Sequence, residues 1–254
     1  MYEILPCYGE EDGVYTARTH EVIIEERYTI WVNGRKILNA MTSPTRLEEF
    51  VIGYLVTEGI ISHCQEIDSL QIEGNQIRVL TIHRAHIRSG TKTVLSGCGG
   101  DSSYLDPARL PDITSDFQIS GERIHATIKK ILDSDLHRLT GGIHVVGLAG
   151  IDGVHTVAED IGRHNALDRV IGYALQHDID LSHCYAVISG RISSEMARKC
   201  LVANIPLIVS RGATTTLAIH LAQGKGLTII GFVRGRKMNI YTHPERIPGI
   251  EIVK

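Results

Sequence analysis

The chain has 254 residues, 43% of them hydrophobic and 22% charged, which is ordinary for a globular protein with one large domain or two modest ones. Its formal net charge of −3 gives no support for a general nucleic-acid binder, which would be strongly basic. No apolar run approaches the roughly 20 residues that cross a bilayer, so we expect no membrane-spanning segment and no membrane partner.

The first part of the chain is predicted to be rich in β-structure. Residues 22–38 are predicted as a β-hairpin, because β-branched and aromatic residues flank the strong turn signal Asn33-Gly34. A second hairpin is expected over residues 70–82, turning at Gly74-Asn75. Residues 91–111 show little periodicity and are predicted as a connecting region.

One helix is predicted between the two hairpins. Its expected start follows Pro44, with Thr45 as the N-cap and Glu48 three residues later, which is the pattern of a capping box. Gly59 is the expected stop, since glycine commonly follows a helix end. These elements predict a β-rich N-terminal domain with one helix over residues 1–115.

Helices and strands alternate from Ser120 to the end of the chain. Such alternation is typical of βαβ crossovers in a layered sheet, and the Asp152-Gly153 hairpin makes that sheet mixed. We therefore predict an α/β domain over residues 116–254. Its expected helices span residues 122–132, 161–176, 193–203 and 215–222, and its expected strands span residues 143–148, 154–158, 185–189, 207–210, 227–233 and 238–242.

The chain contains five cysteines, an odd number, and none belongs to a Cys-x-x-Cys pair. A disulfide framework is therefore not expected, which favours a reducing compartment. The N-terminus carries acidic residues and lacks the basic start and apolar core of a secretory signal, so we expect a cytoplasmic location. The histidines show no zinc-binding spacing, and no metal site is predicted.

Cys98 is the candidate reactive thiol. Gly97, Gly99 and Gly100 surround it, so its backbone is sterically open. Reactivity also needs a lowered thiol pKa, and no cation stands beside Cys98 in the sequence. The residues alone leave a reactive thiol and an ordinary loop cysteine equally open.

Residues 159–169 are unusually polar for a segment between apolar runs. On helical spacing Asp160, His164 and Asp168 lie on one stripe. An apolar stripe that begins at Leu167 runs beside it. We interpret this segment as a helix start that is built to hold another group.

Three loops carry cations where predicted strands end. Arg191 lies between a strand and a helix whose expected N-cap is Ser193, and Arg211 lies at the next such junction. Ligands bind outside the carboxyl ends of strands in open α/β sheets, and a helix N-terminus suits phosphate. A third group of cations lies in the turn at residues 234–237. That turn alone reads as a solvated hairpin tip, but the three groups together would suit a polyanion such as a nucleotide diphosphate.

Four motifs of this chain closely resemble those of the formate dehydrogenase accessory sulfurtransferase family (FdhD), in the same order. They are Thr140-Gly141-Gly142-x-His144, Glu159-Asp160-Ile161-Gly162-Arg163-His164-Asn165-Ala166-x-Asp168, Ser193-x-Glu195-Met196-x-x-Lys199 and Gly231-Phe232-x-Arg234-Gly235. The second motif is very specific. Residues 53–60 are similar to the N-terminal part of the family, so the resemblance covers nearly the whole chain.

The resemblance implies a cytidine-deaminase-like fold for the larger domain and a cytoplasmic homodimer. Members of this family take sulfur as a persulfide from a cysteine desulfurase. They pass it to the molybdenum cofactor, a molybdopterin bis(guanine dinucleotide), before that cofactor enters formate dehydrogenase. A guanine nucleotide such as GDP would mimic part of this cargo.

The resemblance also implies roles for single residues. Cys98 becomes the expected carrier of the persulfide sulfur, because its loop matches the Cys-Gly-x-Cys-Gly loop of the family. Arg191 and Arg211 are expected to help bind the anionic cargo, while Asp160 and His164 either organise the pocket or hydrogen-bond the ligand. The stretch that matches the cofactor-binding segment consists of Phe232, Val233, Arg234, Gly235, Arg236 and Lys237.

The chain departs from the family in having a single cysteine in this loop. Leu95 and Asp101 occupy the two positions where a second cysteine could complete a Cys-x-x-Cys pair. A single carrier needs only one acceptor sulfur, whereas a relay between two cysteines of this loop is excluded. A chaperone that binds the cofactor or the apo-dehydrogenase without carrying sulfur is one alternative function. A zinc-dependent deaminase is another, but the chain lacks the combination of a His-x-Glu motif with a Cys-x-x-Cys motif that such enzymes use.

Overall fold

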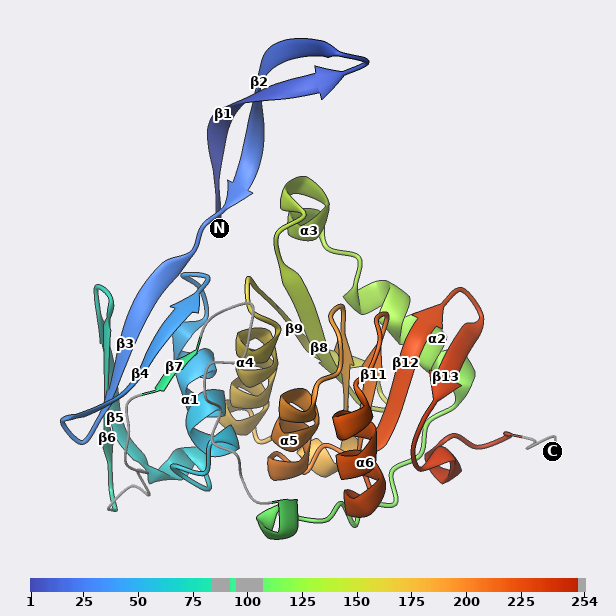
Figure 1. The fold of residues 1–254 in the computed structure, drawn as a ribbon. Helices are drawn as coiled ribbons and strands as arrows, with labels where there is room; N and C mark the ends of the chain where they lie inside the picture. Colours follow the sequence, from blue (N-terminus) through green and yellow to red (C-terminus); the bar gives the residue numbers. More distant parts are fainter. Residues whose placement is uncertain (84–91, 95–106, 251–254) are drawn as a thin grey trace.

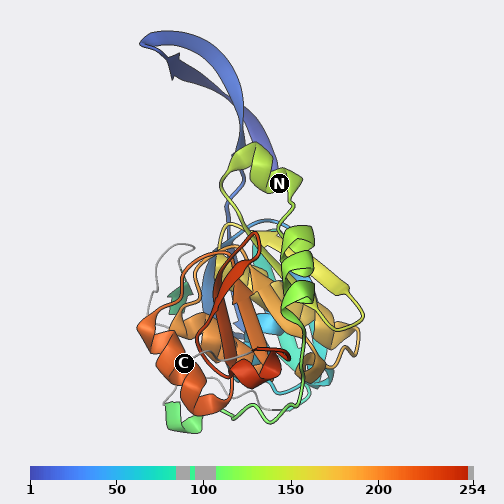
Figure 2. The same cartoon turned by 90° about the vertical axis from the view of Figure 1, so that its right-hand side faces the viewer.

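The computed structural model describes residues 1–83, 92–94 and 107–250, so Cys98 lies outside the described residues. Within them the strands form three separate sheets (Figure 1). A two-stranded ribbon of β1 (Tyr2–Glu11) and β2 (Val14–Ile23) projects from the body of the molecule (Figures 1 and 2). This ribbon was not predicted beyond its last two residues, because its side chains are exposed on both faces and show no buried stripe.

The second sheet confirms the turns of both predicted hairpins, but the first hairpin begins at Glu26, because Val22 and Ile23 belong to β2. β3 and β4 are joined at Asn33-Gly34, and β5 and β6 are joined at Gly74-Asn75. Apolar side chains from β3, β4 and β6 form a core with one helix, α1 (Leu47–Thr57), which lies against this sheet. The strand order is β5 (Ile67–Glu73), β6 (Gln76–Thr81), β3 (Glu26–Val32), β4 (Arg35–Thr42) and β7 (Lys92–Val94).

The predicted start of α1 is wrong by one residue, and the capping box is absent. The N-cap is Arg46, which has a left-handed backbone (φ 49°) and makes no side-chain cap. Thr45 does not cap the helix, and its hydroxyl donates instead to the Met1 sulfur at 3.7 Å. The predicted stop is confirmed: Glu58 ends the helix, and Gly59 follows with a φ of 67°, a left-handed value that favours glycine.

The third sheet is mixed, as predicted. β10, β11 and β12 run parallel, whereas β8 and β13 run antiparallel to their neighbours. The order is β13 (Lys237–Ile240), β12 (Thr228–Arg234), β11 (Leu207–Ser210), β10 (Tyr185–Ile188), β8 (His144–Ala149) and β9 (Val154–Asp160). All six strands lie within three residues of their predicted limits.

Helices cover both faces of this sheet (Figure 2). Side chains of α4, α5 and α6 share one apolar core with alternate strand residues, and α2 shares a second core with the residues between them. The helices are α2 (Gly121–Ile131), α3 (Asp135–Thr140), α4 (Arg163–Gln176), α5 (Ser194–Val202) and α6 (Thr216–Lys225). Short 3-10 turns occupy Cys64–Glu66, Pro107–Arg109, Leu181–His183 and Pro244–Arg246.

The two larger sheets are connected through a close crossing of α1 and α4 (Figure 1). An added Cβ on Gly53 of α1 would lie 1.9 Å from the Asp168 carbonyl oxygen, and one on Gly172 of α4 would lie 1.9 Å from the Glu49 carbonyl oxygen. Glycine on each helix therefore allows the backbones to touch.

The predicted α/β fold class is confirmed: a layered mixed sheet stands beside a smaller β-rich N-terminal part. The boundary predicted between residues 115 and 116 stays a prediction. None of the helices in the described ranges has both the length and the apolar character that a membrane crossing requires.

Candidate functional site

The three cation-bearing loops meet at one edge of the third sheet, which we call the strand-end edge (residues 189–193, 210–215 and 231–237). The parallel strands β10, β11 and β12 all end here, as the prediction required. The loops are bonded to one another: Ser210 Oγ donates to the Gly190 carbonyl at 2.5 Å, and Phe232 N donates to the Gly212 carbonyl at 2.9 Å. Segments that are far apart in sequence thus form one continuous rim.

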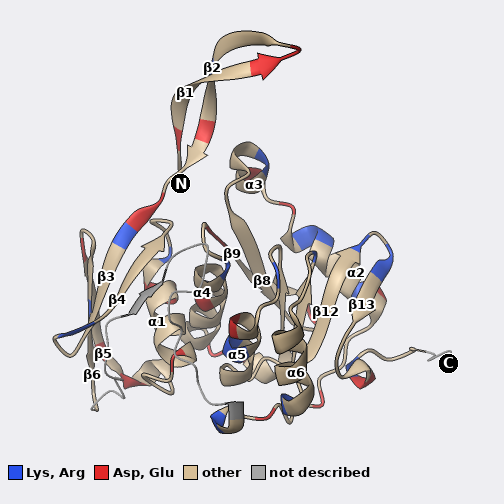
Figure 3. Ribbon diagram, viewed as in Figure 1, with Lys and Arg blue, Asp and Glu red and all other residues tan. Residues whose placement is uncertain are grey.

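Five cations stand on this edge with exposed side chains: Arg191, Arg211, Arg234, Arg236 and Lys237. The turn between β12 and β13 is the basic corner seen in Figure 3. Within the described part of the chain, none of the five forms an ion pair with a carboxylate. Guanidinium groups without an internal partner are well suited to bind phosphate oxygens in a bidentate manner.

Phe232 has an unusual backbone for a bulky residue. It lies at a break in the β12–β13 register between Gly231 and Arg234, and its φ is 54°, in the left-handed region. Bulges of this kind re-aim side chains beside functional sites. The ring of Phe232 is 40% exposed, whereas Val233 is 2% exposed and packs in the core that α2 covers. Val233 can therefore offer a ligand only its backbone.

His164 stands at the start of α4, next to the strand-end edge. Its Nε2 lies 3.1 Å from the Glu195 carboxylate in the first turn of α5, so the pair joins the starts of two helices. The N-cap of α5 is Ser193, as predicted. His144 borders the same place, because its Nδ1 would lie 3.0 Å from a Cβ on Gly190. Burial and the nearby Arg163 cation lower the pKa of His144, which keeps its imidazole neutral near pH 7.

Asp160 is completely buried and saturated with hydrogen bonds. Its Oδ2 accepts from Thr42 Oγ1 at 2.7 Å and Ser43 N at 2.9 Å, and it pairs with the Arg169 guanidinium. Its Oδ1 accepts from Gly162 N at 2.6 Å and Asn165 Nδ2 at 2.9 Å. No capacity remains for a ligand, which favours the organising role among the two that were predicted.

A second buried ionic cluster was missed by the sequence reasoning. Lys199 Nζ donates to both oxygens of Asp168 at 2.8 Å and to Thr57 Oγ1 at 2.9 Å. Beside it Arg198 pairs with Glu58. The cluster ties α1, α4 and α5 together away from the loops. The only signal in the sequence was the presence of Asp168 and Lys199 in two of the recognised motifs.

The cysteines within the described ranges are free, and two of them are buried in the core. Burial raises the pKa of both Cys184 and Cys200 to about 12, so neither thiol forms a significant thiolate at neutral pH. Among the described residues, no three His, Cys, Asp or Glu side chains come together as a metal site would require.

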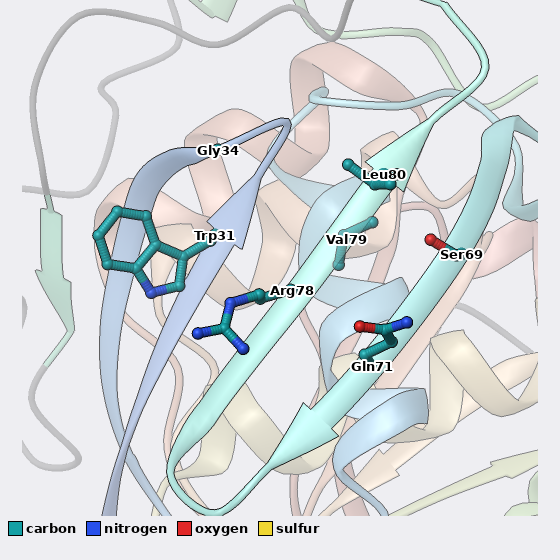
Figure 4. Close-up of a pocket in the computed structure, with 7 residues that line it drawn as sticks. All are labelled: Trp31, Gly34, Ser69, Gln71, Arg78, Val79 and Leu80. Atoms are coloured by element: carbon teal, nitrogen blue, oxygen red, sulfur yellow. The ribbon is translucent and has the colours of Figure 1, made fainter.

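A hollow of about 430 Å³ lies on the second sheet, away from the strand-end edge (Figure 4). Two of the polar groups around it are engaged within the chain: Trp31 Nε1 donates to Gln76 at 2.7 Å, and Arg78 pairs with Glu73 at 2.7 Å. It contains none of the predicted site residues. Its lining consists of Trp31, Gly34, Ser69, Gln71, Arg78, Val79 and Leu80.

Comparison with known proteins agrees with the resemblance found in the sequence. The profile of the FdhD/NarQ family matches residues 23–248. Sulfur carrier protein FdhD of Wolinella succinogenes is 41% identical over 234 residues, covering 89% of this chain and 82% of that protein. The protein of the same name from Bacillus pumilus is 36% identical over 245 residues, covering 93% and 94%.

A crystal structure supports the same relation. That of a candidate formate dehydrogenase accessory protein from Desulfotalea psychrophila superposes with a TM-score of 0.82 at 27% identity. The superposition covers 97% of this chain and 99% of that one. With the profile match and the identities above, this shows that the chain belongs to the FdhD/NarQ family.

Proposed function

We propose that this chain is a cytoplasmic sulfur carrier that serves the maturation of formate dehydrogenase. Cys98 receives sulfur as a persulfide from a cysteine desulfurase and delivers it to the molybdenum cofactor, a molybdopterin bis(guanine dinucleotide). Relatives named sulfur carrier proteins support the carrier role. The observation that carries the cargo assignment is the strand-end edge, where five cations that form no ion pair within the described residues share one rim with the exposed ring of Phe232.

The chemistry of the edge fits this cargo. Each guanine dinucleotide half contains a diphosphate, and arginine forks bind such groups through paired, charge-assisted hydrogen bonds. The N-termini of α5 and α6 point to the same edge and add partial positive charge. The Phe232 ring offers a flat apolar surface on which a guanine base can stack. Asp160 and His164 hold the helix starts in place behind these groups.

The loading step needs one acceptor sulfur. The Cys98 thiolate attacks the outer sulfur of the donor persulfide, a new S–S bond forms, and the donor cysteine leaves as a thiolate. The sulfur that moves is neither oxidised nor reduced in this exchange. The chain then acts as a sulfurtransferase through a single persulfide, without a second loop cysteine.

Incubation with a cysteine desulfurase and cysteine is expected to add about 32 Da, one sulfur atom, to Cys98. The measurement is mass spectrometry of the intact protein and of its peptides. Cys184 and Cys200 serve as internal controls, since their buried thiols stay unmodified. The carrier role fails if Cys98→Ala gains the same mass as the wild type.

GDP is expected to bind more weakly when an edge cation is removed. Loss of one charged hydrogen-bond donor costs about 1.5–3 kcal/mol, so Arg211→Ala or Arg234→Ala should raise the Kd at least about tenfold. Lys129→Ala is the matched control, because Lys129 is also an exposed cation and lies on α2. Isothermal titration calorimetry at fixed salt measures the effect. Equal losses for all three variants would contradict a specific phosphate site.

A cofactor chaperone that carries no sulfur is the second candidate function. The single cysteine of the loop, with Leu95 and Asp101 at the two possible partner positions, favours it. Formate dehydrogenase activity in cells lacking the native accessory protein separates the two functions. A sulfur carrier requires that Cys98→Ser abolish complementation, whereas a chaperone tolerates Cys98→Ser and is inactivated only by Arg234→Ala.

A further inference from the structure

His144 borders the strand-end edge, but no step of the proposed function uses it. It is the first residue of β8, which runs antiparallel to β10. The pairing continues past the end of β10, because Ser189 N donates to the Val145 carbonyl at 2.9 Å and Val145 N donates to Ser189 Oγ at 3.0 Å. Gly190 is therefore the residue directly opposite His144, and residues directly opposite each other share one face of a sheet.

The glycine at position 190 leaves room for the His144 ring. A Cβ added to Gly190 would lie 3.0 Å from His144 Nδ1 and 3.1 Å from its Cε1, which is tighter than ordinary van der Waals contact. It would also lie 3.4 Å from Cδ of Arg163, the first residue of α4. The imidazole and the Arg163 side chain are thus packed against the loop that carries Arg191, one of the five exposed cations of the edge.

The His144 ring has no partner within the described part of the chain. Over residues 1–83, 92–94 and 107–250 its two nitrogens form neither a hydrogen bond nor an ion pair. Most buried or half-buried polar side chains do have such a partner. The ring is only partly buried, and it lies beside a loop of the cation-rich edge. It is therefore available to an anionic ligand.

The surroundings of His144 keep its ring neutral in the free protein. Burial lowers the pKa of the imidazole, and the positive charge of Arg163 acts in the same direction. An anion that binds beside the ring would supply the opposite charge and raise this pKa. The titratable and charged groups around the ring are Arg163 and His164 of α4, Asp160 of β9, His137 of α3, Arg191 of the opposite loop, and Glu195 of α5, which contacts His164.

We propose that His144 is a phosphate-binding residue of the strand-end edge, and that it takes up a proton from solution when the diphosphate of the cargo binds. Both ring nitrogens of a protonated histidine carry hydrogen, so the ring can donate a charge-assisted hydrogen bond to a phosphate oxygen. This inference rests on the proposed cargo and adds one proton to its binding equilibrium. Because the pKa of His144 is higher in the complex than in the free protein, GDP should bind more tightly as the pH falls. The arginines and the lysine of the edge stay charged throughout the neutral range and cannot cause this dependence.

Calorimetric titration with GDP, in two buffers that differ in ionisation enthalpy, counts the protons taken up on binding. At about pH 6.5 the wild type should take up as much as about one proton more than His144→Asn, which keeps a neutral hydrogen-bond donor near the Nδ1 position. Between about pH 7.5 and about pH 6 the Kd should fall at least about fivefold more for the wild type than for this variant. The terminal phosphate of GDP titrates in the same range, but its contribution is common to both proteins.

His220→Asn is the matched control, because His220 is an exposed histidine on α6, and its proton count should equal that of the wild type. NMR of the histidine Cε1–H resonances of the wild type adds a measurement that does not depend on how well a variant folds. One resonance, assigned to His144 by its absence from the variant, should titrate at a higher pH when GDP is bound. Equal proton counts in the wild type and His144→Asn, or no histidine pKa raised by GDP, would each overturn this inference and leave the cargo assignment intact. A wild type that fails to bind GDP would remove the cargo assignment and this inference together.

Discussion

Replacing Arg169 by methionine is expected to lower the free energy of unfolding by about 3–5 kcal/mol. Arg169 is completely buried, and its guanidinium pairs with Asp160. It also donates to the carbonyls of Ser43 at 2.8 Å and Thr45 at 3.0 Å. Methionine would fill most of the space but leave a buried carboxylate without a counter-charge and two carbonyls without donors. The free energy of unfolding of native proteins is only about 5–15 kcal/mol, so this loss should be a large fraction of the total stability.

Arg46 offers a matched control for this prediction. It too bonds across to β9, to the Val157 carbonyl at 2.7 Å, and it pairs with Glu49 at 3.2 Å. Its side chain is 27% exposed, so water can replace the lost contacts, and Arg46→Met should cost about 1 kcal/mol or less. Urea unfolding followed by Trp31 fluorescence and by circular dichroism measures both variants. Equal losses of unfolding free energy in the two variants would mean that the buried Arg169–Asp160 pair does not hold the start of α4.

The same residues explain why the polar segment at 159–169 was hard to interpret. Its composition predicted a helix that holds another group, and the structure identifies the group behind Asp160 as the end of β4. Thr42 and Asp160 are 118 positions apart in the sequence. Spacing within one helix cannot indicate which distant strand supplies its partners. The sequence therefore predicted that the segment is important, but it did not predict that Asp160 binds the end of β4.

Elements after Ser120 could be predicted well, because local sequence signals such as helix caps agree there with the pattern of buried residues. Strand 207–210 and the Ser193 N-cap were predicted as they are observed. The β1–β2 ribbon was missed, since both of its faces are exposed and neither is buried against a core. The convergence of Arg191, Arg211 and the turn at residues 234–237 could be predicted for a topological reason: parallel neighbouring strands must end at the same edge.

Replacing Gly172 by alanine is expected to destabilise the protein by about 3 kcal/mol, against the ordinary preference of helices for alanine. The new methyl group would lie 1.9 Å from the Glu49 carbonyl oxygen, which belongs to the backbone of α1 and cannot rotate away. The two helices would have to separate along their whole contact. Gly53→Ala meets the Asp168 carbonyl oxygen at the same distance and should behave alike.

Gly224 of α6 is the control for this prediction, because alanine there should change the stability in the opposite direction. It is also a helical glycine, but an added Cβ there meets nothing within 4 Å. Gly224→Ala should therefore stabilise the protein by up to about 1 kcal/mol, through helix propensity alone. Urea midpoints of the three variants measure the difference. If Gly172→Ala unfolded at or above the wild-type midpoint, α1 and α4 would not cross at backbone contact, and Asp168 would then lack the close approach of α1, whose Thr57 hydroxyl donates to it.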